Sequence, residues 1–386
     1  MTLPARGDAR ALLQGLVRHD SRNPSLCPGA PGEGPVATWL AEVLTQWGMA
    51  VTLQPVAPGR HNVIARVGPS DGPGRSLMFN GHLDVVDVGQ MVHAPFDATI
   101  EGDRMFGRGT SDMKGGVAAM CAAAARVASQ LNGPLIVAGV VDEEYESLGT
   151  RALIASGHRA DAAIVTEPTR LTIGPAHRGF TWVEFECSGV AAHGSRYDLG
   201  VDAIAHAAAL LAELGRLEAT VLATRHHPLL GRPSLHAATI SGGTGWSTYP
   251  DRCVLRIERR TLPGESTPEV LAEFGRACDA VRAEIPALRV TMRHVLTQAP
   301  SDVAADAPIV TSLGTALRAA GAPAPLAGVT AWTDAALLNA AGIPAICFGP
   351  GDMGLAHADE EYISLDEVDR ATDVLARLAL DWTTAP

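Results

Sequence analysis

The sequence predicts an α/β fold that is interrupted by a second, β-rich domain. Helical and extended hydrophobic patterns alternate along the first half of the chain, which is typical of a sheet covered by helices on both faces. This alternation gives way to longer alternating strands in the middle and returns after residue 308. The length of 386 residues also exceeds that of one ordinary domain. We therefore expect a discontinuous first domain, residues 1–176 and 294–386, with residues 177–293 inserted as an α+β domain.

Each expected element follows from the spacing of its apolar residues. In the first domain, helical spacing predicts helices at residues 8–19, 35–47, 112–131 and 365–382. Short apolar runs predict strands at residues 51–56, 62–67, 76–79, 134–141, 162–165 and 345–348. In the inserted domain we expect strands at residues 180–187, 234–241 and 252–258, and helices at residues 201–217 and 268–283. The proline- and glycine-rich stretch 24–35 is expected to be a surface loop.

Composition and charge argue against several classes of function. The net charge of −12 argues against a nucleic-acid partner, although one local arginine can still hold an anionic small substrate. The sequence shows no apolar stretch long enough to cross a bilayer and no signal-peptide pattern at residues 1–16. The six cysteines are scattered without a CxxC pair, so we expect them to be reduced and buried. These observations predict a cytoplasmic protein that binds neither nucleic acid nor membrane.

Five short segments place acids and histidines at strand ends, where open α/β sheets bind their ligands. They are residues 80–86 (NGHLDVV), 107–116 (GRGTSDMKGG), 141–144 (VDEE), 165–168 (VTEP) and 348–357 (FGPGDMGLAH). Taken singly, each has an ordinary explanation, such as an N-cap for Asp112 or a solvated acidic turn for Glu143 and Glu144. Carboxylates that pack together repel one another, however, unless a cation or solvent offsets their charge.

Taken together, the segments offer a set of ligands for two adjacent divalent metal ions. The candidate ligands, two imidazoles and three carboxylates, are His82, Asp112, Glu144, Glu167 and His357. One carboxylate would bridge the ions, and Glu143 would remain free as a base. Nitrogen and oxygen donors without thiolate suit zinc, with cobalt or manganese as substitutes. Asp84 lies two residues from His82 on an extended segment and so shares its face, where it could hold the second imidazole nitrogen.

The order and wording of these motifs resemble the M20 metallopeptidases, the group of acetylornithine deacetylase, succinyl-diaminopimelate desuccinylase, aminoacylase-1 and glutamate carboxypeptidase. The resemblance implies a zinc-exopeptidase-like three-layer catalytic domain, with the insert as a lid and dimerisation domain. It implies that His82 and Glu167 bind one ion, that Glu144 and His357 bind the other, and that Asp112 bridges them. It also implies that Glu143 is the general base, that Asp84 orients His82, and that the bond between residues 112 and 113 is cis.

Three further resemblances concern the substrate and a partner subunit. Residues 192–195 (AHGS) resemble the segment whose histidine reaches the partner's active site, which implies a homodimer and a trans role for His193. Residues 258–265 (ERRTLPGE) resemble the D-x-R-x-x-P-G-E stretch, so Arg260 takes the place of the substrate-carboxylate anchor. Gly351 is expected to contact the substrate. Ser247 replaces the asparagine common in the GGxxxNxxP motif, which leaves the identity of the substrate open.

The resemblance implies metal-dependent hydrolysis of an amide bond in a small N-acyl amino acid. Alternatives within the family are a dipeptidase, an aminopeptidase or a carboxypeptidase. Glu167, rather than aspartate, resembles the deacylase and carboxypeptidase branches and so favours those over a dipeptidase or aminopeptidase. A second alternative is a catalytically silent protein that binds N-acyl amino acids. The intact Glu143 beside a complete ligand set argues against this second alternative.

Overall fold

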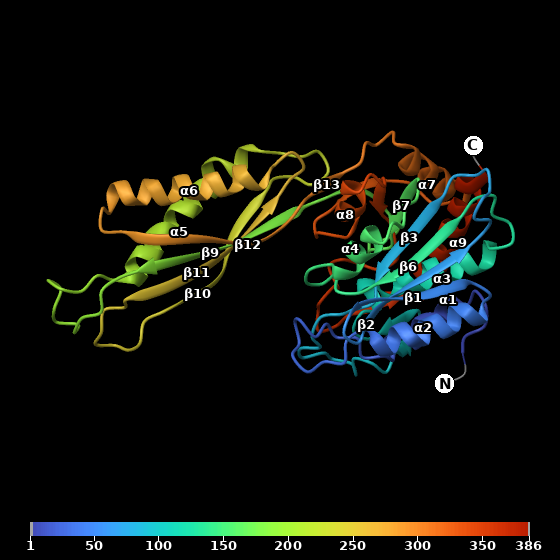
Figure 1. Ribbon diagram of the computed structural model, residues 1–386, viewed down its shortest axis with the longest axis horizontal. Coiled ribbons are helices and arrows are strands. Elements are labelled where there is room, and N and C mark those ends of the chain that lie inside the picture. Colours follow the sequence, from blue (N-terminus) through green and yellow to red (C-terminus); the bar gives the residue numbers. More distant parts are fainter. Residues whose placement is uncertain (1–2, 385–386) are drawn as a thin grey trace. The chain divides into compact units, whose positions relative to one another are not determined.

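The computed structural model describes residues 3–384 and divides the chain into two compact units (Figure 1). The first unit comprises the chain up to Ala176, Val303–Val329 and the chain from Thr333 onward. The second unit comprises His177–Asp302 and Thr330–Trp332. It extends beyond residue 293 because the strand β12 (Arg289–Gln298) pairs along its length with β9 (Gly179–Ser188).

The first unit is a mixed sheet with helices on both faces, which confirms the predicted fold class (Figure 1). Its helices are α1 (Ala9–Val17), α2 (Gly34–Gln46), α3 (Gly115–Val127), α4 (Leu148–Ala155), α7 (Pro308–Ala319), α8 (Ala335–Ala340) and α9 (Leu365–Thr384). Its central strands are β1 (Ala50–Ala57), β2 (Arg60–Val67), β3 (Leu77–His82), β6 (Leu135–Val140), β7 (Ala162–Val165), β8 (Ile173–His177), β14 (Leu326–Val329) and β15 (Ala345–Cys347). A small separate sheet contains β4 (Thr99–Glu101), β5 (Arg104–Phe106) and β16 (Tyr362–Ser364).

The middle of the central sheet is parallel and buried. The strand order is β1-β2-β6-β3-β7-β15-β8, and β6, β3, β7 and β15 run parallel to one another. All residues of these four strands are buried, as expected for strands covered on both faces. Because parallel strands end at the same edge of a sheet, the segments that follow β3, β6, β7 and β15 meet at one edge.

The long alanine-rich helix begins later than its hydrophobic pattern predicts. A π-helical turn, Thr110–Lys114, precedes α3, and Asp112 and Met113 within it have non-helical backbone angles. The Asp112–Met113 peptide bond is cis, which confirms that expectation. The start of α3 lies against the end of β7, since a Cβ at Gly116 would lie 1.9 Å from the Thr166 carbonyl oxygen. Glycine at this position therefore allows α3 to begin beside the edge where the strands end.

The second unit is a four-stranded antiparallel sheet with two long helices. Its elements are β9, α5 (Ala203–Thr220), the short 3-10 helix η2 (Leu222–Thr224), β10 (Ser234–Gly242), β11 (Arg252–Thr261), α6 (Thr267–Glu284), β12 and β13 (Ser301–Asp302). The sheet order is β10-β11-β9-β12. Alternate residues of β9, including Val183 and Phe185, are buried in a core shared with α5 and α6. Phe185 meets Phe274 of α6 edge-on, with 5.7 Å between ring centroids.

Two further predictions can be compared with this structure. All six cysteines are buried and none forms a disulfide, which confirms their expected placement. Within residues 3–384, no helix combines the length and apolarity that a membrane crossing requires. Half of the stretch 24–35 is exposed, but Cys27, Gly32 and Glu33 within it are buried, so the surface-loop prediction is wrong at those residues.

Candidate metal centre

One group of potential metal ligands joins the ends of β3 and β7 to the π-helical turn. His82, the last residue of β3, Asp112 and Glu167 each offer a ligand atom within 4.8 Å of the other two. His82 Nε2 lies 3.0 Å from Asp112 Oδ1, and its Nδ1 lies 2.9 Å from the backbone oxygen of Asp84. The imidazole is thus held at one nitrogen by a carbonyl and presents the other to the cluster.

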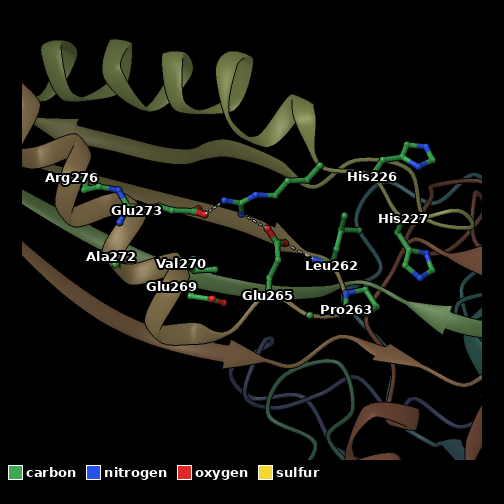
Figure 2. Close-up of a pocket in the computed structure, with 12 residues that line it drawn as sticks. His226, His227, Leu262, Pro263, Glu265, Glu269, Val270, Ala272, Glu273 and Arg276 are labelled. Atoms are coloured by element: carbon green, nitrogen blue, oxygen red, sulfur yellow. Dashed lines mark hydrogen bonds and ion pairs between the residues drawn. The ribbon is translucent and has the colours of Figure 1, made fainter.

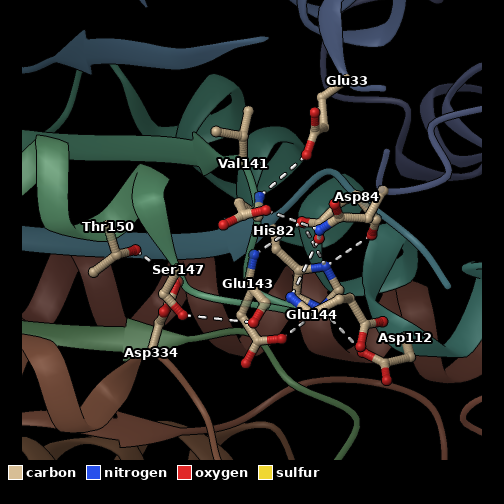
Figure 3. A network of polar contacts seen from close by, with 12 residues as sticks. Glu33, His82, Asp84, Asp112, Val141, Glu143, Glu144, Ser147, Thr150 and Asp334 are labelled. Carbon is tan, nitrogen blue, oxygen red and sulfur yellow. Dashed lines mark hydrogen bonds and ion pairs between the residues drawn. The ribbon is translucent and has the colours of Figure 1, made fainter. Parts of the chain in front are cut away.

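A second group shares Asp112 with the first. Asp112, Glu144 and His357 also offer ligand atoms within 4.8 Å of one another. His357 Nε2 lies 3.4 Å from Asp112 Oδ2 and 3.1 Å from Glu144 Oε2. The two oxygens of Asp112 therefore face two different histidines, His82 and His357. This arrangement brings the five predicted ligands together with Asp112 in the middle. Figure 3 shows His82, Asp112 and Glu144 of this group close to one another.

Electrostatics at the site are dominated by negative charge in a buried setting. Burial raises the pKa of Glu167 well above its usual value, and the nearby Asp112 carboxylate adds to the rise. Burial lowers the pKa of His82, but its hydrogen bond to Asp112 and the surrounding carboxylates raise the pKa well above normal overall. Hydrogen bonds to Asp112 and Glu144 raise the pKa of His357 to about 10. Such shifts are those of a site in which carboxylates outnumber the cationic groups.

One buried carboxylate oxygen at this centre is suited to bind a cation. Glu167 is 2% exposed, and its Oε1 is buried without a hydrogen-bond partner among the described residues. A buried, unpaired carboxylate oxygen is costly unless a cation satisfies it. The donor set of imidazole nitrogens and carboxylate oxygens is one that divalent metals such as zinc accept. The residues of this centre therefore fit a pair of divalent ions.

Glu143 lies beside the two ligand groups on the turn that follows β6. Its Oε2 lies 4.0 Å from His82 Nε2. The Asp84 carboxylate accepts the backbone N–H groups of Glu143 and Glu144 at 3.1 and 3.2 Å. The same carboxylate approaches His82 Nδ1 only to 3.7 Å, so the hydrogen bond to His82 comes from the backbone oxygen of Asp84. In this structure the Asp84 side chain thus fixes the turn more closely than it fixes the imidazole.

Some residues that shape the centre are absent from the predicted set. Glu361, which is 1% exposed, accepts the backbone N–H groups of Ser111 and Asp112 at 3.0 and 3.1 Å and so holds the loop of the central carboxylate. Asp334 accepts the Thr150 hydroxyl at 2.6 Å, and burial raises the pKa of Asp334 to about 6. The only sequence signal for either residue is an acid at the end of a loop, which is common to many solvated turns.

Gly351 lies in the loop between β15 and His357. It has a φ of +92°, and a Cβ there would lie 2.6 Å from Ser111 Oγ. Its backbone N–H donates to Glu367 Oε2 at 2.8 Å. Glycine is thus needed for both conformation and space, and the loop packs closely on the turn that carries Asp112.

The other predicted residues, His193, Ser247 and Arg260, lie on the second unit. His193 is exposed, and its Nδ1 lies 2.9 Å from Ser195 Oγ. The loop of His193 pairs with the loop of Ser247, since the Gly194 N–H donates to the Ser247 carbonyl at 2.8 Å. On β11, Arg260 Nε donates to Glu258 Oε1 at 2.6 Å. His193 and Ser247 therefore share one loop pair, whereas Arg260 lies in the sheet.

The second unit also contains a cavity of about 580 Å³ between α6 and the turn that follows β11 (Figure 2). Its buried acids are paired within the protein. Arg225 contacts Glu265 and Glu273 at 2.5 Å each, and the fully buried Arg259 contacts Glu265 at 2.5 Å. The candidate metal-ligand groups among residues 3–384 lie in the first unit, not in this cavity.

Comparison with known proteins identifies the family. Residues 78–381 match the family described as "Peptidase family M20/M25/M40". The chain belongs to this family. It is 32% identical to acetylornithine deacetylase from Myxococcus xanthus over 82% of each chain. It is 29% identical to N-formyl-4-amino-5-aminomethyl-2-methylpyrimidine deformylase from Bacillus subtilis (strain 168), over 92% of this chain and 90% of the other. The chain is accordingly an M20 metallohydrolase, and metal-dependent amide hydrolysis fits its relatives.

Solved structures share the fold over nearly the whole chain. The M20 metallo-carboxypeptidase Sso-CP2 from Sulfolobus solfataricus has a TM-score of 0.80 at 17% identity, covering 98% of this chain and 100% of its own. A dinuclear metal-binding M20 peptidase from Bacillus subtilis has a TM-score of 0.74 at 15% identity, covering 98% of each chain. The resemblance to M20 proteins and the predicted fold class are therefore both confirmed.

Proposed function

We propose that the protein removes the acyl group from a small N-acyl amino acid by hydrolysing its amide bond. The observation that carries the proposal is the placement of Asp112 between two histidines, with Glu143 Oε2 4.0 Å from His82 Nε2. Of the relatives, one is named a deacetylase and another a deformylase, and both names denote removal of a small acyl group. This common chemistry favours deacylation over the cleavage of dipeptides.

The five ligands would hold two divalent ions, most simply zinc, with cobalt or manganese as substitutes. His82 and Glu167 would hold one ion, Glu144 and His357 the other, and Asp112 both. When bound, such ions acidify a water molecule and polarise the amide carbonyl. Metal analysis of the purified protein by mass spectrometry identifies the native metal. A count of fewer than two ions per chain in fully active protein contradicts the two-ion arrangement.

Glu143 carries the proton steps of this mechanism. It takes a proton from the attacking water as the water oxygen bonds to the amide carbon. As the carbon–nitrogen bond breaks, Glu143 passes that proton to the leaving amine, so the products are a carboxylate and a free amino group. Asp84 keeps Glu143 in place through the backbone hydrogen bond described above. Arg260 would hold the carboxylate of the substrate, and Ser247 and Gly351 would line its site, so that binding also positions the scissile bond.

A substrate screen tests the proposed reaction. Metal-free protein is reloaded with Zn²⁺ or Co²⁺ and incubated with N-acetyl, N-formyl and N-succinyl amino acids and with dipeptides. We expect release of free amino acid from one N-acyl series. Hydrolysis of dipeptides alone would identify the peptidase alternative, and tight binding without hydrolysis of any compound would identify a silent binder.

We also propose a two-fold dimer through the second unit, with His193 acting at the partner's site. The exposed position of His193, on a loop that is hydrogen-bonded to the loop of Ser247, supports this role. Mixing inactive His193→Ala and Glu143→Gln chains tests it, because an exchanged dimer contains one site with both residues intact. We expect up to half of normal activity per mixed dimer. Verified exchange of subunits without recovery of activity, or a fully active monomer, contradicts the proposal.

The six reduced, buried cysteines support a cytoplasmic location for the enzyme.

A further inference from the structure

Three buried charged side chains lie behind the turn that carries Glu143 and Glu144, and the mechanism above does not use them. Glu33 and Asp142 are completely buried, and Arg60 is 6% exposed. Burying charges costs free energy unless they are closely paired, and a paired group of this kind is suited to fixing a geometry. The contacts of these three residues lead toward the turn of Glu143 and Glu144.

Arg60 connects the other two charges. Its Nε and Nη2 donate to the two carboxylate oxygens of Glu33 at 2.7 and 2.5 Å. This paired contact fixes the plane of the guanidinium group. The remaining nitrogen, Nη1, is then directed at Asp142 Oδ1, 2.8 Å away. A planar guanidinium can make these three contacts at once, whereas the single ammonium group of lysine cannot.

Asp142 is held through both its backbone and its side chain. Its N–H donates to Glu33 Oε1 at 3.1 Å, while its Oδ1 contacts Arg60. Its Oδ2 accepts the N–H of Glu146 at 3.3 Å, which closes the turn. Asp142 has a φ of +68°, a left-handed conformation that is uncommon for residues other than glycine. Because Asp142 directly precedes Glu143, this conformation sets the direction in which the turn leaves β6.

A second contact ties the same turn to Asp84. The Asn23 side-chain amide donates to Asp142 Oδ1 at 3.1 Å and to Asp84 Oδ2 at 2.8 Å. Asp84 in turn accepts the backbone N–H groups of Glu143 and Glu144. The turn is thus held both by Asp84 and by the pair of Arg60 and Glu33.

We propose that Arg60, by pairing at once with Glu33 and Asp142, is a positioning residue that directs Glu143 and Glu144 toward the metal centre. This inference rests on the proposed roles of Glu143 and Glu144. It predicts that loss of Arg60 weakens metal binding more at the ion site that contains Glu144 than at the other site. Glu144 belongs to the group with Asp112 and His357, whereas His82 and Glu167 lie on other segments.

The test titrates the metal-free, full-length protein with Co²⁺, followed by visible absorption and calorimetry. Arg60→Met should bind one Co²⁺ as tightly as the wild type and the other about 10–100-fold more weakly, the usual effect of removing a support behind metal ligands. Its kcat should fall by a similar factor while KM changes less than about twofold. Arg60→Lys, which keeps the charge but not the planar fork, should lie between Arg60→Met and the wild type.

Arg66→Met is the matched control, because Arg66 lies exposed on the same strand and contacts His158 outside the network. It should leave both Co²⁺ affinities and kcat unchanged. Unchanged values in folded Arg60→Met would overturn the proposal, and so would equal weakening of both ions together with a lower melting temperature. If Arg60→Met does not fold, Arg60→Lys and Glu33→Gln serve the same comparison. A wild-type protein that binds fewer than two Co²⁺ contradicts the proposed function instead.

Discussion

Buried acidic side chains gather in both units, but they are balanced by different partners. In the second unit, Glu265 and Glu273 line one cavity (Figure 2), and both contact arginines of the same chain, including the completely buried Arg259. At the metal centre the carboxylates face two histidines, and Glu167 Oε1 has no hydrogen-bond partner among the described residues. Arginine keeps its charge at any ordinary pH and completes a structural ion pair by itself.

Buried carboxylates therefore serve two different purposes in this protein. A carboxylate cluster closed by arginines stabilises the fold without outside help, and a cluster left short of positive charge is suited to binding cations.

Replacing Glu143 by glutamine should have the largest effect. Glutamine cannot accept the proton of the attacking water, so turnover should fall about 10²–10⁴-fold, the range for loss of a general base. Metal content, measured by mass spectrometry, should stay at the wild-type value. Glu144→Gln is the paired variant, and it should lose metal because Glu144 belongs to a ligand group. Equal metal loss in both variants would show that the two neighbouring acids do not have separate roles.

Removing Arg259 should destabilise the second unit without affecting the metal. Arg259→Met leaves Glu265 and the buried Glu273 short of a partner, and breaking a buried ion pair from one side costs about 3–5 kcal/mol. Urea unfolding followed by circular dichroism measures this loss. Arg256→Met is the control, since Arg256 lies exposed on the same strand and pairs with Glu184 at the surface. That surface pair should contribute less than about 1 kcal/mol. Similar losses of unfolding free energy in both variants would show that the buried ion pairs of Arg259 contribute no more to stability than a surface pair.

Adding metal should stabilise the first unit selectively. Zn²⁺ at about 100 times its dissociation constant should raise the free energy of unfolding by about 2.7 kcal/mol, because it binds the folded state. Thermal unfolding with and without Zn²⁺ measures the change. Asp112→Ala, which removes the shared carboxylate, should abolish it, whereas Arg256→Met should retain it in full. Stabilisation of the Asp112 variant would place the bound metal elsewhere.

The smallest expected effect concerns a histidine of the second unit. Burial lowers the pKa of His177 to about 4, and its Nε2 is buried without a hydrogen-bond partner among the described residues. Because the unfolded chain takes up the proton first, near pH 6.5, the stability contributed by neutral His177 is complete above that pH and is lost as pH falls toward 4. Between pH 7 and pH 5 this loss should be about 2 kcal/mol.

His177→Asn should remove that part of the pH dependence, as measured by urea unfolding at several pH values. An unchanged slope in the variant would show that His177 is not the group that titrates. The pKa values of His177 and of His357 at the metal centre are shifted in opposite directions. There, hydrogen bonds to carboxylates raise the pKa of His357, whereas burial without an acidic partner lowers that of His177.

Elements with a strong hydrophobic period could be predicted from the sequence, and elements without one could not. The strand β7 was predicted with the bounds that the structure gives, Ala162–Val165. The strand β12 was not, because most of its residues, such as Arg293 and His294, are exposed and show no regular alternation. The helix α3 was predicted from residue 112, but the turn that carries Asp112 follows other contacts, including those with Glu361.

The motifs of the sequence are sufficient to predict which chemical groups the chain brings to the metal centre. Histidines and acids that end parallel strands must meet at one edge of the sheet, so the convergence of His82, Glu144 and Glu167 followed from the order of the strands. Tertiary structure alone decided how these groups are held. Arg60 and Glu33 reach the turn of Glu143 from distant segments that carry no motif. Their contacts depend on the path of the backbone and on buried hydrogen-bond geometry, neither of which is encoded in the local spacing of residues.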